Sequence, residues 1–273
     1  MNYVKVVAGF IFMLLLLSLT GCELLVSQLA FHPDNVNVLS VEQLPHRMRE
    51  LTIKTEDDVR ITSLYLPSKN TSPQSHKLVI YFHGNGGNIY HRIPSLLQLQ
   101  KSGVNVLGAE YRGYGKSEGN PSEAGIYLDG KSVLNHAVNE MGFALKNIIL
   151  IGRSIGSTVA IHTAQNQALN GLILVTPLTS GKDQAETMGL GSISFLAGDA
   201  FNNIEKILNI QAPLLVIHGT NDEVIPYQLG TDVFERAKVK KELITIEGGS
   251  HNNLHDDYAH EYWLPIFRFI AGS

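Results

Sequence analysis

The sequence has a single cysteine, more acidic than basic residues and a rather short N-terminal apolar run, and each of these features argues against a class of structure or function. With Cys22 alone, the chain cannot form an internal disulfide. Lysine and arginine number 21 against 25 aspartates and glutamates, a net charge of −4 with no basic patch to bind nucleic acid. The apolar stretch from Val6 to Leu19 spans about 14 residues, whereas a membrane-spanning helix needs roughly 20. Internal repeats and low-complexity linkers are also lacking.

A short motif near the middle of the chain points to a nucleophilic serine. The pentapeptide G-R-S-I-G at 152–156 follows the apolar segment 147–151, which predicts a buried strand, and precedes a helix-forming segment at 157–164. A G-x-S-x-G sequence between strand and helix makes a turn so tight that glycines are needed on both sides of the serine. We therefore expect the Ser154 hydroxyl to stand above the end of a sheet, with the Ile155 N–H facing the same space.

Two further strands carry the groups that such a serine needs, a general base and an acid to orient it. The apolar segment 213–218 predicts a buried strand, and a turn with Asp222 follows it. The segment 242–246 predicts the last strand, and a Gly-Gly-Ser loop leads towards His251. Ser154, Asp222 and His251 thus follow three strands in turn, and an open parallel sheet builds its sites at the carboxyl ends of its strands.

Other acids and histidines nearby have simpler interpretations. Glu223 shares a turn with Asp222 and is expected to face away, and Asp199 is expected to cap a helix that starts at Phe201. His218, which ends a buried strand, is expected to be a hydrogen-bonded core histidine. We expect no metal site and no cofactor. A polar helix start accounts for His255, His260, Asp256 and Asp257, and the glycines at 84–87 lack the third glycine of a dinucleotide loop.

A glycine-rich segment upstream supplies candidate hydrogen-bond donors for a reacting oxyanion. The apolar segment 77–82 predicts a buried strand that runs into H-G-N-G-G-N at 83–88. Because glycines let the backbone approach a substrate closely, the N–H of Asn85 or of Gly86 is expected to pair with that of Ile155 as an oxyanion hole.

Five motifs together resemble those of the α/β-hydrolase superfamily, in its serine-aminopeptidase-like branch of small, sparsely capped hydrolases. They are H-G-N-G-G-N at 83–88, E-Y-R-G-Y-G-K-S-E-G at 110–119, G-R-S-I-G at 152–156, H-G-T-N-D-E at 218–223 and G-G-S-H-N at 248–252. The resemblance covers roughly residues 50 to 270. It implies Ser154 as nucleophile, His251 as general base, Asp222 as the acid that orients it, and the N–H groups of Asn85 and Ile155 as the oxyanion hole. Glu110 stands where the family pattern has aspartate, a departure that concerns the architecture of its loop.

The order of predicted elements indicates an α/β fold in which a mostly parallel central sheet has helices on both faces. Segments 51–55 and 59–66 alternate with period two and predict an antiparallel hairpin at one edge of the sheet. Strands and helices then alternate to the end of the chain, with a helix over 124–141. Between the strands at 171–176 and 213–218 lies a short cap, 177–212. Its apolar middle forms either the wall or mobile lid of an acyl pocket, or an ordinary crossover packed on the sheet.

The N-terminus resembles that of a bacterial lipoprotein precursor. Lys5 precedes the apolar stretch, and L-T-G-C at 19–22 resembles a lipobox, in which Cys22 is diacylated and becomes the new N-terminus. We therefore predict a signal peptide at 1–21, a lipid-anchored tether and lead-in at 22–48 and the hydrolase domain at 49–273. The predicted location is the bacterial cell envelope, and Glu23 after the cysteine favours the outer membrane, facing the periplasm. An uncleaved anchor helix is the alternative.

These observations favour a serine hydrolase that cleaves an ester, thioester or amide of a small-molecule acyl substrate through an acyl-enzyme intermediate. An esterase acting on small to medium acyl groups is the first interpretation. A peptidase acting on N-terminal residues is the alternative among enzymes. The alternative that is not an enzyme is a non-catalytic envelope interaction module on the same fold.

Overall fold

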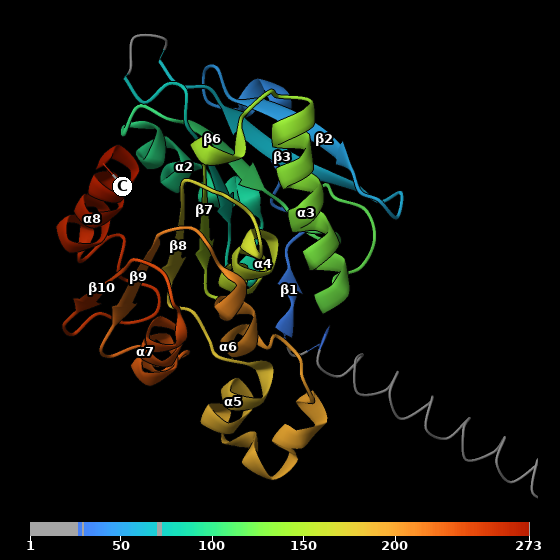
Figure 1. The fold of residues 1–273 in the computed structure, drawn as a ribbon. Helices are drawn as coiled ribbons and strands as arrows, with labels where there is room; N and C mark the ends of the chain where they lie inside the picture. The colour runs from blue at the N-terminus through green and yellow to red at the C-terminus, as the bar shows by residue number, and fades with distance from the viewer. Residues whose placement is uncertain (1–26, 29, 70–72, 273) are drawn as a thin grey trace, which may run out of the picture.

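The computed structural model describes residues 27–28, 30–69 and 73–272, which are built around one eight-stranded sheet (Figure 1). Its strand order is β10-β9-β8-β7-β4-β6-β3-β2, and all neighbours pair in parallel except that β3 runs antiparallel to both β2 and β6. The strands are β2 (Arg49–Lys54), β3 (Arg60–Leu66), β4 (Leu78–Phe82), β6 (Asn105–Ala109), β7 (Ile148–Arg153), β8 (Gly171–Val175), β9 (Leu214–Gly219) and β10 (Lys241–Ile246). The predicted edge hairpin and the mostly parallel sheet are confirmed.

Helices cover both faces of the sheet (Figure 1). One face carries α3 (Glu123–Asn139), α4 (Ile155–Ala164), α6 (Asn203–Lys206) and α7 (Tyr227–Arg236), and the other carries α2 (Ile93–Gln100) and α8 (Ala259–Gly272). The central strands are apolar on both sides because successive residues of a strand point to opposite faces. In β7, Ile148 and Leu150 pack into the core under α3 and α4, whereas Ile149 and Ile151 pack into the core under α2 and α8.

The segment before the sheet packs onto the domain. A two-residue strand, β1 (His32–Pro33), pairs in parallel with β5 (Gly86–Gly87), which follows β4. Phe31 is buried and packs edge-on against Phe201, with ring centroids 6.1 Å apart. From Ala30 onward, the predicted lead-in is therefore part of the folded domain. The predicted signal peptide and Cys22 lie outside the described residues. Within the described ranges, no helix has both the length and the apolar character needed to cross a membrane.

The cap between β8 and β9 is built from short helical pieces. It contains α5 (Gly181–Ala185), a π-helical turn (Glu186–Leu190) and a 3-10 helix (Gly191–Ala197), followed by α6. Asn202, not Asp199, is the N-cap of α6, and its side chain accepts the Glu205 N–H at 3.4 Å. The prediction of a helix that starts at Phe201 and is capped by Asp199 was wrong. Phe201 has a φ of 54°, in the left-handed region, so it cannot be a residue of a right-handed helix.

Candidate active site

Ser154 occupies the sharp turn between β7 and α4, and the two flanking glycines explain how the chain makes that turn. The serine has a φ of 53°, which is uncommon for a residue other than glycine. A Cβ on Gly152 would lie 2.4 Å from the carbonyl oxygen of Gly156, and one on Gly156 would lie 2.3 Å from that of Phe82. Both obstacles are backbone atoms, so no side-chain rearrangement could relieve either contact. Ser154 is thus held in a strained conformation by the packing of α4 against the sheet.

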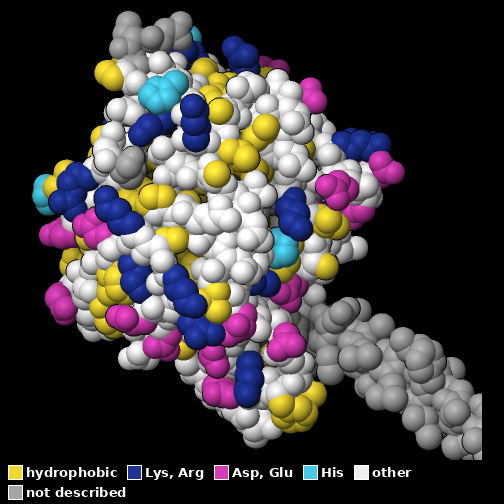
Figure 2. All heavy atoms as spheres, viewed as in Figure 1, with side chains coloured by type: hydrophobic (Ala, Val, Ile, Leu, Met, Phe, Trp, Pro, Cys, Tyr) yellow, Lys and Arg dark blue, Asp and Glu magenta, His cyan; other side chains and the backbone are white. Residues whose placement is uncertain are grey.

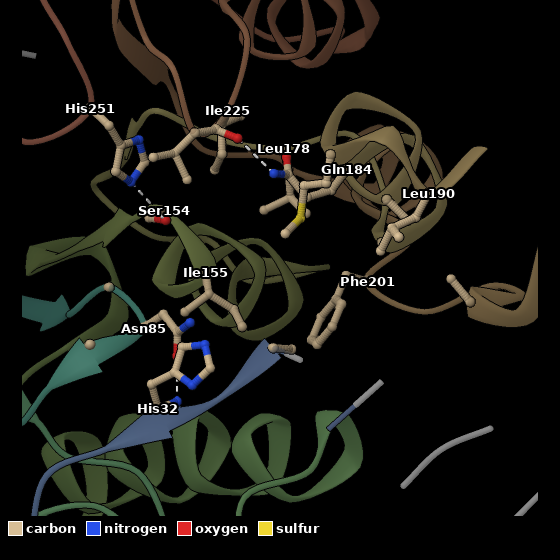
Figure 3. Close-up of a pocket in the computed structure, with 18 of the residues that line it drawn as sticks. His32, Asn85, Ser154, Ile155, Leu178, Gln184, Leu190, Phe201, Ile225 and His251 are labelled. Atoms are coloured by element: carbon tan, nitrogen blue, oxygen red, sulfur yellow. Dashed lines mark hydrogen bonds between the residues drawn. The ribbon is translucent and has the colours of Figure 1, made fainter. Parts of the chain in front are cut away.

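Ser154, His251 and Asp222 form a hydrogen-bonded series. His251 Nε2 lies 3.2 Å from Ser154 Oγ (Figure 3). His251 Nδ1 lies 2.8 Å from Asp222 Oδ2. The three residues are 6–8 % exposed. They follow the carboxyl ends of β7, β9 and β10, so the parallel sheet brings together groups that are 97 residues apart in the chain. The structure therefore places all three predicted residues within reach of one another.

The carboxylate of Asp222 is saturated with donors. Its Oδ1 accepts the backbone N–H groups of Val224 at 2.9 Å and Ile225 at 2.7 Å, and both carboxylate oxygens face His251 Nδ1, Oδ2 at 2.8 Å and Oδ1 at 3.0 Å. Burial by itself would raise the pKa of the Asp222 carboxyl, but hydrogen bonds from His218 and His251 outweigh burial and hold that pKa below its ordinary value. The side chain is therefore a carboxylate at neutral pH, the form needed to fix the orientation of an imidazole.

His218 is a buried histidine, as predicted, but it also contacts the acid. Its Nε2 lies 2.8 Å from the carbonyl oxygen of Ile225 and 3.3 Å from Asp222 Oδ2. Its Nδ1 is buried and has no hydrogen-bond partner among the described residues. The proton therefore belongs on Nε2, where it serves both acceptors. The sequence held a signal for this contact, because His218 lies near the end of β9, only four residues before Asp222.

Two further side chains hold the loop that carries His251. Arg153 donates to the His251 carbonyl oxygen at 2.8 Å and to Asn252 Oδ1 at 3.0 Å. Glu223 accepts the His251 backbone N–H at 3.2 Å. The expectation that Glu223 faces away was wrong, because the turn folds back on Asp222 and brings the neighbouring carboxylate against the histidine loop. Neither contact was predicted, since each links loops that are far apart in the sequence.

The loop after β4 lies beside the serine. A Cβ on Gly84 would lie 3.5 Å from Ser154 Cβ, an ordinary contact distance. Asn85 Oδ1 accepts the His32 N–H at 2.8 Å and lies 3.1 Å from the Tyr114 hydroxyl, so β1 helps to fix this loop. Ile155 is the first residue of α4, and the N–H of such a residue has no acceptor within its own helix. Asn85 and Ile155 lie near one another on one side of a pocket (Figure 3).

Residues of the motif at 110–119 hold this loop in place through buried hydrogen bonds. His83 and Glu110 are fully buried, with Nε2 and Oε1 2.6 Å apart, and His83 Nδ1 lies 2.6 Å from the Gly84 carbonyl oxygen. Glu110 Oε2 also accepts the Ile89 N–H at 2.8 Å, and the Tyr111 hydroxyl donates to the His83 carbonyl oxygen at 2.8 Å. The departure at Glu110 does concern loop architecture, but its partner His83 was not identified from the sequence.

A cavity of about 570 Å³ opens in front of Ser154 (Figure 3). Its far walls are apolar and come mostly from the cap, with side chains that include Leu178, Met188, Leu190, Ile193, Leu196 and Phe201. Its polar end contains Ser154, Asn85 and His251 together with Arg92 and Arg153, and no aspartate or glutamate is among the described residues that line it. The cap therefore forms the wall of a pocket rather than a mere crossover.

The fold and the geometry around Ser154 define the class of the protein. A mostly parallel sheet with a strained serine at a strand-to-helix turn, linked through a histidine to a carboxylate past a later strand, is the architecture of an α/β hydrolase. The chain matches the family model described as "Serine aminopeptidase, S33" over residues 73–205 and 195–258, and it belongs to that family.

Individual relatives agree with this placement. The chain is 32% identical over 252 residues to the alpha/beta hydrolase domain-containing protein aho-3 of Caenorhabditis elegans, a match that covers 86% of this chain and 75% of the relative. It is also 32% identical over 202 residues to the human alpha/beta hydrolase domain-containing protein 17B, covering 74% and 68% of the two chains. Among solved structures, the esterase Pf2001 of Pyrococcus furiosus superposes with a TM-score of 0.71 at 23% identity, over 88% of this chain and 98% of the esterase, which shows a shared fold.

Proposed function

We propose that the protein is a carboxylesterase whose catalytic triad is Ser154, His251 and Asp222. His251 Nε2 takes the Ser154 proton as Oγ attacks the substrate carbonyl carbon, and the N–H groups of Asn85 and Ile155 donate to the resulting oxyanion. The imidazolium then returns the proton to the leaving alkoxide, so that the alcohol departs and an acyl-serine remains. Water, deprotonated by the same histidine, cleaves the acyl-serine to the carboxylic acid and restores the enzyme.

The character of the pocket favours an acyl ester over an aminoacyl substrate, and this observation carries the proposal. An aminopeptidase must hold the charged α-amino group of its substrate, which calls for a carboxylate or other acceptors near the serine. The charged groups at the polar end are instead the guanidinium groups of Arg92 and Arg153, and no carboxylate is among the described lining residues. An ammonium group would be repelled there, whereas an acyl chain would bury its surface against the apolar wall of the cap.

A paired measurement tests this proposal. The parent should react with a serine-directed fluorophosphonate and hydrolyse p-nitrophenyl butyrate, with a kcat/KM on the order of a hundredfold above that for leucine p-nitroanilide, a difference of about 2.7 kcal/mol in activation free energy. Ser154→Ala should lose labelling and turnover while keeping the parent's thermal unfolding midpoint, and Ser192→Ala, an exposed serine of the cap, should change nothing. A higher kcat/KM on the anilide would favour the aminopeptidase. A parent that neither labels nor turns over any ester would favour a non-catalytic module.

We also propose that the precursor is a lipoprotein of the bacterial envelope, cleaved before Cys22 and anchored through acyl chains on that residue, with its domain in the periplasm. The lipobox-like L-T-G-C at 19–22 supports this proposal, and the two sequence relatives from Caenorhabditis elegans and human, both eukaryotes, do not bear on it. Cys22→Ser should abolish incorporation of labelled palmitate and release the protein from the membrane fraction. A Cys22→Ser protein that still sediments with membranes would point to an uncleaved apolar helix at 6–19.

A further inference from the structure

We propose that the tip of the cap, residues 187–198, docks on the surface of a lipid bilayer, so that the pocket takes amphiphilic acyl esters directly from the membrane. The docking surface follows from the structure of the cap. The substrate class deepens the proposed esterase function and rests on it.

The cap tip has the composition of a segment that can enter a membrane interface. From Thr187 to Gly198 it contains no charged residue, and Glu186 and Asp199 mark its two ends. Three of its large apolar side chains are exposed: Met188 at 61%, Ile193 at 43% and Phe195 at 68%. Hydrophobic side chains are visible at the bottom of the molecule, where the cap lies (Figure 2). Several exposed apolar side chains on one short segment favour an interaction site, and within residues 187–198 lipid contact would desolvate no charged side chain.

The same surface is continuous with the pocket. Met188 and Ile193 are both exposed to solvent and part of the cavity lining, so they form a rim between the outside of the cap and the space in front of Ser154. An acyl chain that leaves a bilayer through this rim would pass from one apolar environment to another. That route avoids the free-energy cost of exposing each CH2 group of the chain to water.

The short distance along the chain between the cavity and the predicted membrane anchor favours a membrane as the partner. Ala30, close to the start of the described residues, lines this same cavity. Ala30 is the eighth residue after Cys22, and a fully extended chain between the two spans at most roughly 29 Å. An acylated Cys22 would therefore hold Ala30, and with it this part of the cavity wall, within that distance of the bilayer. An uncleaved apolar helix ending at Leu19 would do the same within roughly 40 Å.

The docking itself can be tested without any enzymatic turnover. The full chain, purified with its own anchor and reconstituted on phosphatidylcholine vesicles, would carry Phe195→Trp, with Leu264→Trp as the control. Leu264 is 44% exposed on α8, which lies away from the cap (Figure 1). Replacing the vesicle lipid with dibrominated-acyl phosphatidylcholine should quench the added fluorescence at position 195, beyond the background of the native Trp263, and leave that at position 264 unchanged. Equal quenching at the two positions would overturn the proposal.

The delivery of substrate has a second readout. Phe195 is not a lining residue of the cavity, so Phe195→Asp should hydrolyse soluble p-nitrophenyl butyrate within twofold of the parent. On a fluorogenic long-chain ester embedded in the vesicles, the same variant should be slower by about tenfold or more, with Leu264→Asp unaffected on both substrates. Unchanged hydrolysis of the embedded ester would refute delivery from the membrane. A parent inactive on both esters would refute the proposed esterase function, and the quenching measurement would still decide the docking.

Discussion

Asp222→Asn is the sharpest test of the triad, because the structure dictates how the new amide must sit. The backbone N–H groups of Val224 and Ile225 both point at Oδ1, so the amide oxygen has to take that place. The amide NH2 then occupies the position of Oδ2 and faces His251 Nδ1 at 2.8 Å and His218 Nε2 at 3.3 Å. His251 can accept a hydrogen bond there only by moving its proton to Nε2, and that tautomer cannot take the proton of Ser154.

Two losses set the expected magnitude. Keeping the productive tautomer sets the His251 Nδ1–H against the amide NH2 and leaves it only the amide oxygen at the Oδ1 position, 3.0 Å away and shared with two backbone N–H groups, a loss of about 1–3 kcal/mol. The imidazolium formed in the transition state also loses its carboxylate partner, and opposite unit charges 4 Å apart attract by about 4 kcal/mol at an effective dielectric constant of 20. Together the two losses amount to roughly 5–7 kcal/mol, or a factor on the order of 10⁴ to 10⁵ at 1.36 kcal/mol per decade. In another protein with a Ser-His-Asp triad, the same Asp-to-Asn substitution lowers kcat by about 10⁴.

The assay is kcat on p-nitrophenyl butyrate, measured beside a thermal unfolding scan that shows the variant to be folded. Asp199→Asn, on an exposed residue of the cap, is the matched control and should keep the parent's kcat. Glu223→Gln should also stay within a few-fold, since the amide oxygen can still accept the His251 N–H. A folded Asp222→Asn protein with kcat within tenfold of the parent would refute the tautomer argument and the assignment of the acid.

Three further substitutions test the surroundings of the site. His218→Leu should lower kcat by about tenfold with little change in KM, because Asp222 loses a donor, and His218→Gln should restore part of the rate if the contact matters beyond packing. Gly156→Ala should lower the free energy of unfolding in urea by about 1–3 kcal/mol or more, whereas Gly191→Ala, whose Cβ meets open space, should not; equal stabilities would contradict the steric account of the elbow. Burial, and to a smaller extent the positive charges of Lys131 and Lys206, lowers the pKa of His162 from 6.5 to about 4. The stability that the neutral imidazole contributes to the folded state is therefore present above pH 6.5 and is lost as the pH falls towards 4. The urea midpoint of the parent should therefore fall more between pH 7 and pH 4.5 than that of His162→Phe, which keeps the stacking on Tyr127, and parallel declines would contradict this.

Features that depend on local chain geometry could be predicted from the sequence alone. The apolar strands, the edge hairpin and the strand–helix alternation follow from the spacing of apolar residues. The sharp turn at 152–156 was predictable because its two glycines stand where a strand-to-helix turn around a serine has no room for a side chain. The grouping of Ser154, Asp222 and His251 was also predictable, because parallel strands have their carboxyl ends at one edge of a sheet, and each residue follows such an end.

The supporting contacts were decided only by the tertiary structure. His83 with Glu110, His218 with Asp222, and Glu223 and Arg153 with the His251 loop depend on where side chains point after the turns have closed. A hydrogen bond forms or fails over a few tenths of an ångström, and no periodicity in the sequence encodes that distance. The same holds for the cap, where the sequence left a pocket wall and a plain crossover equally open. Short helical turns bring its apolar residues over the serine, and that packing of non-adjacent segments is what makes the pocket.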